Sequence, residues 1–283
     1  MVSPHAATEP VLTVVITCMG RLHHLRQSLP LVAAQTRVRC LVVDYACPDD
    51  SGSWVESRLP MVQVVRRLAK TRFNISKARN LGASQANTPW VCFMDADTLA
   101  GPEVFGRILD VLRDRTFFLA DPCPDALSGM VVCRLDDFRA IGGYDELFSG
   151  WGSEDRDLYT RLERSGCTRA FFQAQAISMI DHGDAERTRY HRIGDHFLSL
   201  RLNGLYFQIK TDLARQTNTV ELSLEHRQAI RSRISNLVLS NPHSAVQMEV
   251  ELPWTTDFMQ PPGWQLRRSI RYVFEPEKPS HHE

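Results

Sequence analysis

Two carboxylates stand one residue apart in the stretch "FMDADTL", residues 93–99, as Asp95 and Asp97. The apolar run 90–94 comes directly before Asp95, so both acids stand at the end of a segment typical of a buried β-strand. Carboxylate oxygens are ligands that hard cations such as Mg²⁺ and Mn²⁺ prefer. The spacing therefore indicates a cation site at a strand end, although a solvated loop after a strand would have the same composition.

A second polar group lies in "GWGSEDRDLYTRLERSG", residues 150–166. Ser153 and the acids after it are typical of a helix start, where a hydroxyl caps the helix and carboxylates complement its dipole. This does not explain Trp151, an aromatic residue between Gly150 and Gly152. An aromatic ring can stack on a sugar, and glycines let a ligand approach the backbone closely. A carboxylate beside such a pocket is a reasonable general base.

The elements that must position these groups alternate between strand and helix along the first half of the chain. Apolar runs predict strands near residues 11–19, 40–43, 62–68 and 90–98, and helical patterns cover residues 21–35, 76–87 and 102–114. This order predicts an α/β fold with a mostly parallel sheet flanked by helices. In such sheets ligands bind beyond the carboxyl ends of the strands, where Asp44, Asp95 and Asp97 stand.

The alternation fades after residue 129. Residues 169–184 are rich in strand-forming residues, and helical patterns cover residues 191–216 and 223–241. We therefore expect a tail (1–10), a catalytic domain (11–190) and a helical and irregular extension (191–283).

One segment of the extension has two interpretations. Residues 264–274, "WQLRRSIRYVF", could form a basic amphipathic helix. Such a helix would pack on the catalytic domain or on a second subunit, or would lie weakly on an anionic membrane.

The composition excludes several classes of protein. Of the 283 residues 43% are hydrophobic, as in an ordinary globular protein, and no apolar run approaches the roughly 20 residues that span a bilayer. Lys and Arg number 33, as do Asp and Glu, so the basic excess typical of a nucleic-acid partner is missing. The seven cysteines form no CxxC pair, and residues 1–10 do not have the pattern of a signal peptide. These features predict reduced thiols and a cytoplasmic location.

Taken together, the ordered motifs resemble those of a known family. The chain is similar to nucleotide-sugar glycosyltransferases of the GT-A fold, in the broad sense of glycosyltransferase family 2. Its second half resembles the carboxyl-terminal catalytic region of the β-1,4-galactosyltransferase and polypeptide N-acetylgalactosaminyltransferase group. The motifs lie within about residues 11–185 and read "TVVITCMGRL", "LVVDYACPDDSG", "ISKARNLGA", "FMDADT", "IGGYDELFSGWGSEDRDLYTRL" and "DHGD".

The resemblance implies a donor site. Asp97, the second acid of the DxD motif, would bind a Mn²⁺ or Mg²⁺ ion, with Asp95 in the metal shell or on the ribose and His182 as a further metal ligand. The imidazole would favour Mn²⁺. The remaining contacts to a UDP-sugar would come from Thr17, Arg21, Asp44 and Arg79. The common "DDGS" nucleotide loop is replaced by "DYACPDDSG", which keeps Asp44.

The resemblance also implies an acceptor site. Trp151 and Gly152 would line it, Glu154 would hold an acceptor hydroxyl, and Asp155 would be the catalytic base. Inverting members have Asp at the position of Asp155, whereas the retaining N-acetylgalactosaminyltransferases have Asn, so inversion is expected. The product would be a hexose or N-acetylhexosamine joined to a hydroxyl, as on a glycan.

Two other functions stay open at this point. A nucleotidyltransferase that makes sugar nucleotides would want a Gly-rich, Arg-containing loop after the first strand, and "TCMGRLHHL" offers one Gly and one Arg. A degenerate transferase could serve as a sugar-binding subunit, but the intact DxD, ED and His motifs argue against it.

Overall fold

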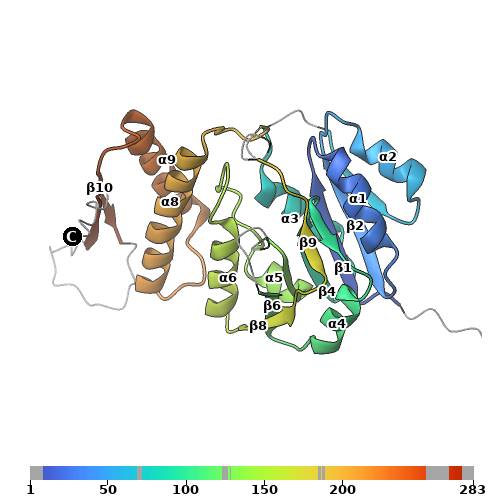
Figure 1. The fold of residues 1–283 in the computed structure, drawn as a ribbon. Helices are drawn as coiled ribbons and strands as arrows, with labels where there is room; N and C mark the ends of the chain where they lie inside the picture. Colours follow the sequence, from blue (N-terminus) through green and yellow to red (C-terminus); the bar gives the residue numbers. More distant parts are fainter. Residues whose placement is uncertain are drawn as a thin grey trace, which may run out of the picture.

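The computed structural model describes residues 9–275 apart from 69–71, 123–126, 128, 184–185, 187–188 and 253–267. Its centre is a 7-stranded sheet with the strand order β3-β2-β1-β4-β7-β6-β8 (Figure 1). All neighbours pair in parallel except β7, which is antiparallel to β4 and β6. The strands are β1 (Leu12–Cys18), β2 (Val38–Tyr45), β3 (Gln63–Arg67), β4 (Trp90–Asp95), β6 (Thr116–Asp121), β7 (Val131–Arg134) and β8 (Thr168–Gln173).

Helices cover both faces of this sheet, because successive side chains of a strand point to opposite faces. Leu12, Val14 and Ile16 of β1 pack in one hydrophobic cluster, and Val15 packs in the other. The first cluster includes residues of α1 (Leu22–Ala33), α2 (Ser51–Arg58) and α4 (Val104–Val111). The second includes residues of α3 (Ile75–Gln85), α5 (Leu135–Ala140) and α6 (Glu154–Arg164).

A short antiparallel ribbon joins two distant segments near the end of β4. It pairs β5 (Thr98–Ala100) with β9 (Ile177–Met179). In addition, the backbone N–H of Ile180 donates to the carbonyl oxygen of Asp97 over 2.9 Å. The chain that follows β9 is therefore held against the end of β4.

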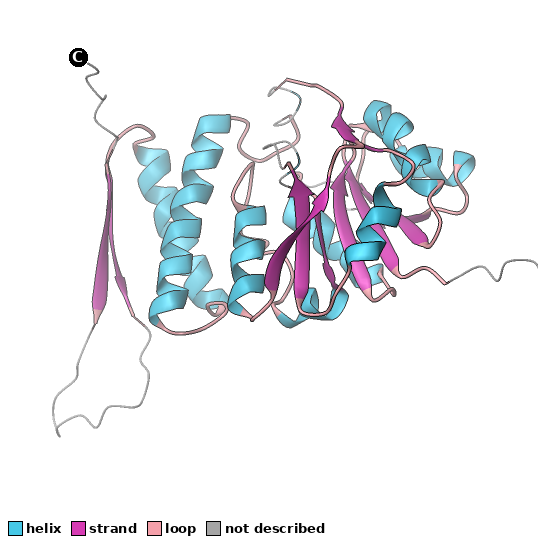
Figure 2. Cartoon of the chain, turned by 60° about the horizontal axis from the view of Figure 1, so that its bottom comes forward, coloured by secondary structure: helices cyan, strands magenta, loops and turns pink. Residues whose placement is uncertain are grey.

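The C-terminal part contains α8 (His196–Gln216), α9 (Leu224–Ser240) and a hairpin of β10 (Val246–Glu251) with β11 (Ser269–Phe274). Helix α8 stands beside α6, α9 packs on α8, and the hairpin lies on the side of these helices away from the central sheet (Figures 1 and 2). Their apolar side chains form a third cluster, which Phe148 joins from the segment between α5 and α6. The division of the chain at residue 190 stays a prediction.

The predicted helix at residues 264–274 is wrong where it can be checked. Ser269–Phe274 is strand β11, and residues 264–267 lie outside the described residues. Ile270, Tyr272 and Phe274 alternate along the strand and pack on the third cluster, whereas Val273 is half exposed. The buried side chains of this segment therefore repeat every two residues, as in a strand, because β10 provides a hydrogen-bonding partner for its backbone.

Other elements were not predicted. The segment after Asp50, predicted as loop, is helix α2, and β6 adds a strand to the sheet between β7 and β8. None of the helices in the described ranges is long and apolar enough to cross a membrane. The cysteines of these ranges are free thiols, and all except Cys47 are buried.

Candidate active site

A cavity of about 610 Å³ opens beyond the carboxyl ends of β1 and β4. The "DAD" segment lines one part of it, and the "GWGSED" segment lines another. The structure thus brings nearly all the predicted site residues together, and only Asp44 is missing from this lining. The predicted residues that do line the cavity are Thr17, Arg21, Arg79, Asp95, Asp97, Trp151, Gly152, Glu154, Asp155 and His182.

Asp97 and His182 form the predicted carboxylate–imidazole pair. Nε2 of His182 lies 2.5 Å from Oδ2 of Asp97, and the two side chains are 3% and 8% exposed. The β5–β9 ribbon explains the contact, because it begins at Thr98, directly after Asp97, and ends at Met179, three residues before His182. Arg21 is also present: its Nη1 atom is 3.0 Å from Oδ2 of Asp97 and 2.8 Å from Nε2 of His182.

This pair has the chemistry of a cation site. Oδ1 of Asp97 and Nδ1 of His182 are buried without a hydrogen-bond partner in the described structure. His24 of α1 belongs to the same group, since one possible ligand atom from each of His24, Asp97 and His182 lies within 4.8 Å of the others. Burial lowers the pKa of His24, which keeps its imidazole neutral. The sequence analysis did not identify His24.

Asp95 has a different environment from Asp97. Its side chain is 35% exposed, and its Oδ1 atom accepts a hydrogen bond from Nη2 of Arg79 over 3.2 Å. It is not part of the group of possible ligands that contains Asp97. The structure therefore leaves Asp95 on the cavity wall, and a direct bond to a metal ion stays a prediction.

Arg79 lies beneath the carboxylates of the cavity. It is 2% exposed, and its Nη1 atom is 2.6 Å from Oδ1 of Asp155 and 3.7 Å from Oε1 of Glu154. Tyr144 also donates its hydroxyl to Oδ1 of Asp155 over 3.3 Å. Gly129 lies over this pair, because a Cβ atom there would come 2.6 Å from Nη2 of Arg79.

Burial raises the pKa values of the carboxyl groups of Glu154 and Asp155 above their ordinary values. Burial and the charge of Asp155 raise the pKa of Glu154 to about 8. Burial also raises the pKa of Asp155, while the guanidinium of Arg79 opposes that rise. Since Arg79 lies closer to Asp155 than to Glu154, we assign the negative charge of the pair to Asp155. An ionised Asp155 is what a general base requires.

Helix α8 positions the loop that carries Trp151. The backbone N–H of Trp151 donates to Oγ of Ser199 over 2.6 Å, and Nδ2 of Asn203 donates to the carbonyl oxygen of Trp151 over 3.2 Å. The indole ring is 4.2 Å from the ring of His196, measured between centroids. Sequence reasoning missed these contributions from α8, because nothing in the spacing of the two segments relates them.

The backbone of this loop is left-handed at several positions. Gly150 has φ of 91° and Gly152 has φ of 99°, conformations that glycine adopts without steric cost. Ser153 has φ of 74° and occupies the N-cap position of α6, but its side chain makes no capping hydrogen bond. Ser153 is therefore at the predicted N-cap position, but the predicted hydrogen bond from a helix N–H to its hydroxyl is absent in this left-handed conformation.

Asp44 lies in a second cavity, of about 820 Å³, which shares Met19 and Tyr190 with the first. Its Oδ1 atom accepts the N–H of Cys47 over 2.8 Å, and its Oδ2 atom accepts the N–H of Gly52 over 2.9 Å. The carboxylate thus holds the loop that leads into α2. A contact between Asp44 and a nucleotide stays a prediction.

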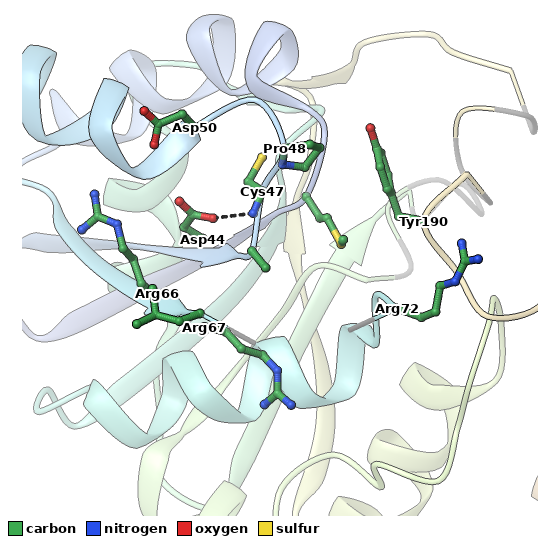
Figure 3. A pocket seen from close by; sticks show the side chains of 11 residues that line it. Asp44, Cys47, Pro48, Asp50, Arg66, Arg67, Arg72 and Tyr190 are labelled. Carbon is green, nitrogen blue, oxygen red and sulfur yellow. Dashed lines mark hydrogen bonds between the residues drawn. The ribbon is translucent and has the colours of Figure 1, made fainter. Parts of the chain in front are cut away.

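Three arginines line this second cavity and were not predicted. Figure 3 shows Arg66, Arg67 and Arg72 along one side, with Cys47 and Pro48 across from them. The guanidinium of Arg67 lies 5.1 Å from the centre of the Tyr45 ring. Arg66 could have been predicted from the parallel pairing of β2 with β3, because Arg66 lies opposite Asp44 at the ends of these two strands.

Comparisons with known proteins agree with this architecture. Residues 115–183 match a family model described as the N-terminal domain of galactosyltransferase. Beta-1,4-galactosyltransferase 5 of Homo sapiens is 28% identical over 128 residues, which cover 38% of this chain and 33% of the relative. Validoxylamine A glucosyltransferase of Streptomyces hygroscopicus subsp. jinggangensis is 26% identical over 222 residues, 56% of this chain and 52% of the relative. The chain thus spans between a third and about half of these relatives.

Solved structures show the same fold. S. aureus TarS 1-349 in complex with UDP-GlcNAc has a TM-score of 0.58 at 15% identity, covering 81% of this chain and 73% of that one. The mannosyltransferase PcManGT from Pyrobaculum calidifontis, in complex with GDP-Man and Mn²⁺, has a TM-score of 0.52 at 13% identity, covering 80% and 70%. The prediction of a GT-A fold is confirmed. The matched family model and the two relatives are those of glycosyltransferases.

Proposed function

We propose that this chain is a metal-dependent, inverting glycosyltransferase that moves a hexose or N-acetylhexosamine from a UDP-sugar to a hydroxyl of a glycan. The observation that carries the proposal is the single cavity with a carboxylate–imidazole pair in one part and an ionised carboxylate in another. A transfer to a hydroxyl needs both: one part to hold the departing diphosphate and one to remove a proton from the acceptor.

Asp97 and His182 would hold the metal ion. The buried, unpartnered Oδ1 atom of Asp97 fits a cation, and Nε2 of His182 lies beside the same carboxylate. A carboxylate with an imidazole suits Mn²⁺ better than Mg²⁺. The bound ion would neutralise negative charge on the leaving diphosphate. Arg21, whose guanidinium lies at the same pair, supplies positive charge from the chain itself.

The nucleoside would occupy the cavity that contains Asp44. The two cavities adjoin at Met19 and Tyr190, so one extended ligand can reach from Asp44 to Asp97. The resemblance to β-1,4-galactosyltransferases supports UDP as the nucleotide. PcManGT, however, is a complex with GDP-Man, so GDP-sugars belong among the donors to be tested.

The acceptor would lie against Trp151, within reach of Asp155. Both residues line the same cavity, and the indole offers a stacking face for a sugar ring. Asp155 removes the proton of the attacking hydroxyl, while Arg79 and Tyr144 hold its Oδ1 atom in place. Glu154, protonated at neutral pH, donates a hydrogen bond to a neighbouring oxygen.

The test is nucleotide release from a panel of UDP- and GDP-sugars in the presence of Mn²⁺, with and without glycan acceptors. Release of UDP that EDTA and Asp97→Ala abolish supports the proposal, and Asp110→Ala, at an exposed position of α4, is the matched control. Release of pyrophosphate from UTP would instead indicate a nucleotidyltransferase. Binding of a UDP-sugar without turnover on any acceptor would indicate a non-catalytic subunit.

A further inference from the structure

We propose that His24 is a third protein ligand of the cation held by Asp97 and His182, so that the site consists of one carboxylate and two imidazoles. This inference rests on the proposed function, since it names the ligand set of the same metal ion. None of the sequence motifs pointed to His24, and helix α1 brings it to the site.

The geometry places three possible ligand atoms together. One atom each from His24, Asp97 and His182 lies within 4.8 Å of the others. Ligands bound at about 2.1 Å from one metal ion are at most about 4.2 Å apart, so only small side-chain movements are needed. The rings of His24 and His182 are stacked, with 5.1 Å between their centroids and 30° between their planes, so the two side chains lie next to each other.

The burial of these side chains is the second observation. The side chains of His24, Asp97 and His182 are 3%, 8% and 3% exposed. Each also has a buried polar atom that lacks a hydrogen-bond partner in the described structure: Nδ1 of His24, Oδ1 of Asp97 and Nδ1 of His182. Buried polar atoms are normally satisfied, and a group of unsatisfied ones calls for a missing partner. One cation takes one ring nitrogen from each imidazole, and Nε2 of His182 is the nitrogen that faces Asp97. A cation would therefore be the partner for Oδ1 of Asp97 and for Nδ1 of His24, not for Nδ1 of His182.

Arg21 shows that the site accepts positive charge. Its Nη1 atom contacts both Oδ2 of Asp97 and Nε2 of His182. Arg21 is the N-cap residue of α1, the helix that carries His24. A metal ion at the pair would displace this guanidinium toward the cavity, where the diphosphate of a donor would meet it.

A second group of possible ligands competes for His24. It contains His23, His24 and Glu186, with Nε2 of His24 3.7 Å and Nε2 of His23 3.1 Å from Oε1 of Glu186. His23 is 58% exposed, so water can satisfy its imidazole, whereas Oε1 of Glu186 is itself buried without a hydrogen-bond partner in the described structure. The group with Asp97 is more buried, and it alone adjoins the "DAD" strand end, which favours it.

The ligand set determines which metals are bound. Mg²⁺ prefers oxygen ligands and keeps several waters, whereas Mn²⁺, Co²⁺ and Zn²⁺ accept imidazole. Two imidazoles therefore predict strong discrimination against Mg²⁺. A site without His24 would discriminate less.

The experiment measures metal binding, not turnover. Mn²⁺ is titrated into the full chain with and without UDP, and free Mn²⁺ is followed by electron paramagnetic resonance. His24→Gln should weaken Mn²⁺ binding at least about tenfold, as loss of even a supporting group at a metal site does. The preference for Mn²⁺ over Mg²⁺, measured by competition, should also decrease. His24→Asn repeats the test with a smaller side chain, and thermal unfolding without metal verifies that each variant is folded.

His23→Gln is the matched control and should bind Mn²⁺ like the wild type. Wild-type affinity in folded His24→Gln would overturn the inference, as would no Mn²⁺ binding by the wild type under either condition. An equal loss in His23→Gln would also overturn it, in favour of the group with Glu186. UDP release is measured in a separate assay. If His24→Gln leaves turnover unchanged, only this inference is refuted. If the protein binds Mn²⁺ through His24 but shows no turnover, only the proposed function is refuted.

Discussion

Arg79 donates a hydrogen bond from Nη1 to Oδ1 of Asp155 over 2.6 Å, and its Nη2 atom reaches Oδ1 of Asp95 at 3.2 Å. One buried guanidinium of α3 thus joins the end of β4 to the start of α6. The resemblance implied a contact between Arg79 and the nucleotide. In the structure its contacts are with the carboxylates and with the ring of Tyr144, so that Arg79 holds these groups in place. A contact between Arg79 and a nucleotide stays a prediction.

Replacing Arg79 should destabilise the protein strongly. Arg79→Met leaves the carboxylates of Asp95 and Asp155 without their buried partner, and breaking a buried pair costs about 3–5 kcal/mol. Urea unfolding at pH 7 measures the loss. The control is Arg107→Met, which removes an exposed pair with Glu103 and should cost less than about 1 kcal/mol. Similar losses in both variants would contradict this account.

Asp155→Asn should slow the reaction without weakening donor binding. The amide keeps the shape of the carboxylate but cannot take a proton, so kcat should fall by about 10²–10⁴. Donor affinity is measured by calorimetry, and the anomer of the product by nuclear magnetic resonance. A loss of donor affinity would place Asp155 in the nucleotide site, and a product that retains the donor configuration would refute inversion.

Glu154 should make stability depend on pH. Its pKa is about 8 in the folded protein, against an ordinary value of 4.5. Between these values the folded state holds a proton that the unfolded chain has lost, so the free energy of unfolding falls as pH rises from about 4.5 to about 8. Glu154→Gln, neutral at every pH, removes that loss.

Urea unfolding at several pH values tests the prediction for Glu154. The gain in stability of Glu154→Gln over the wild type should be larger at pH 8 than at pH 4. The exposed Glu225 provides the control, since Glu225→Gln should follow the wild-type pH profile. A constant difference between Glu154→Gln and the wild type across this range would show that folding leaves the pKa of Glu154 at its ordinary value.

Cys47 should be an unusually reactive thiol. Its Sγ atom lies 3.0 Å from the N–H of Gly20 and 2.8 Å from Oγ of Ser51, and hydrogen bonds, led by that from Cys18, lower its pKa to about 6. At pH 7 most of it is thiolate, the form that reacts. Iodoacetamide should therefore label Cys47 several-fold faster than an ordinary thiol, and labelling should slow as the pH falls through about 6.

Peptide mass spectrometry locates the label, and Cys47→Ser is the control. UDP should protect Cys47 if the nucleoside occupies the cavity with Asp44, because both residues line it. Labelling that rises only above pH 8 would show that the thiol has its ordinary pKa.

Lys210 should be essential to the junction between α6 and α8. Its Nζ atom lies 2.8 Å from Asp145, 2.7 Å from Asp157 and 2.7 Å from Glu221, with 2% of the side chain exposed. Lys210→Met should lower the free energy of unfolding by about 3–5 kcal/mol, because it leaves buried carboxylates short of positive charge. The exposed Arg215 of the same helix gives the comparison, and Arg215→Met should change little.

The sequence predicted the parts of the fold whose signals are local. Strands β1 and β4 are continuous apolar runs, as expected for strands buried on both faces, and α8 has a long helical pattern. Helix α2 was missed because its start depends on the carboxylate of Asp44, which accepts the N–H of Gly52. Strand β11 was mistaken for a helix because β10, its partner, was not recognised.

The candidate site was predictable as a set of residue types, but its contacts were not. Motif order brought the "DAD" and "GWGSED" segments to one cavity. The pairing of Arg21 with His182 spans 161 positions, and that of Arg79 with Asp155 spans 76. Such contacts follow from strand order and from the β5–β9 ribbon, which no periodicity in the sequence encodes.

The hydrogen bond from Trp151 to Ser199 spans 48 positions, so the ribosome adds Ser199 to the chain well after Trp151. As the chain leaves the ribosome, β1 to β4 can assemble the donor side while α8 is still unmade, because folding proceeds from the N-terminal part. The acceptor loop gains its partner only after α8 has emerged. We therefore expect nascent chains with residues 1–190 outside the ribosome to bind UDP while Trp151 is still solvent-exposed. Chains with residues 1–252 outside the ribosome should shield Trp151 from quenchers of indole fluorescence.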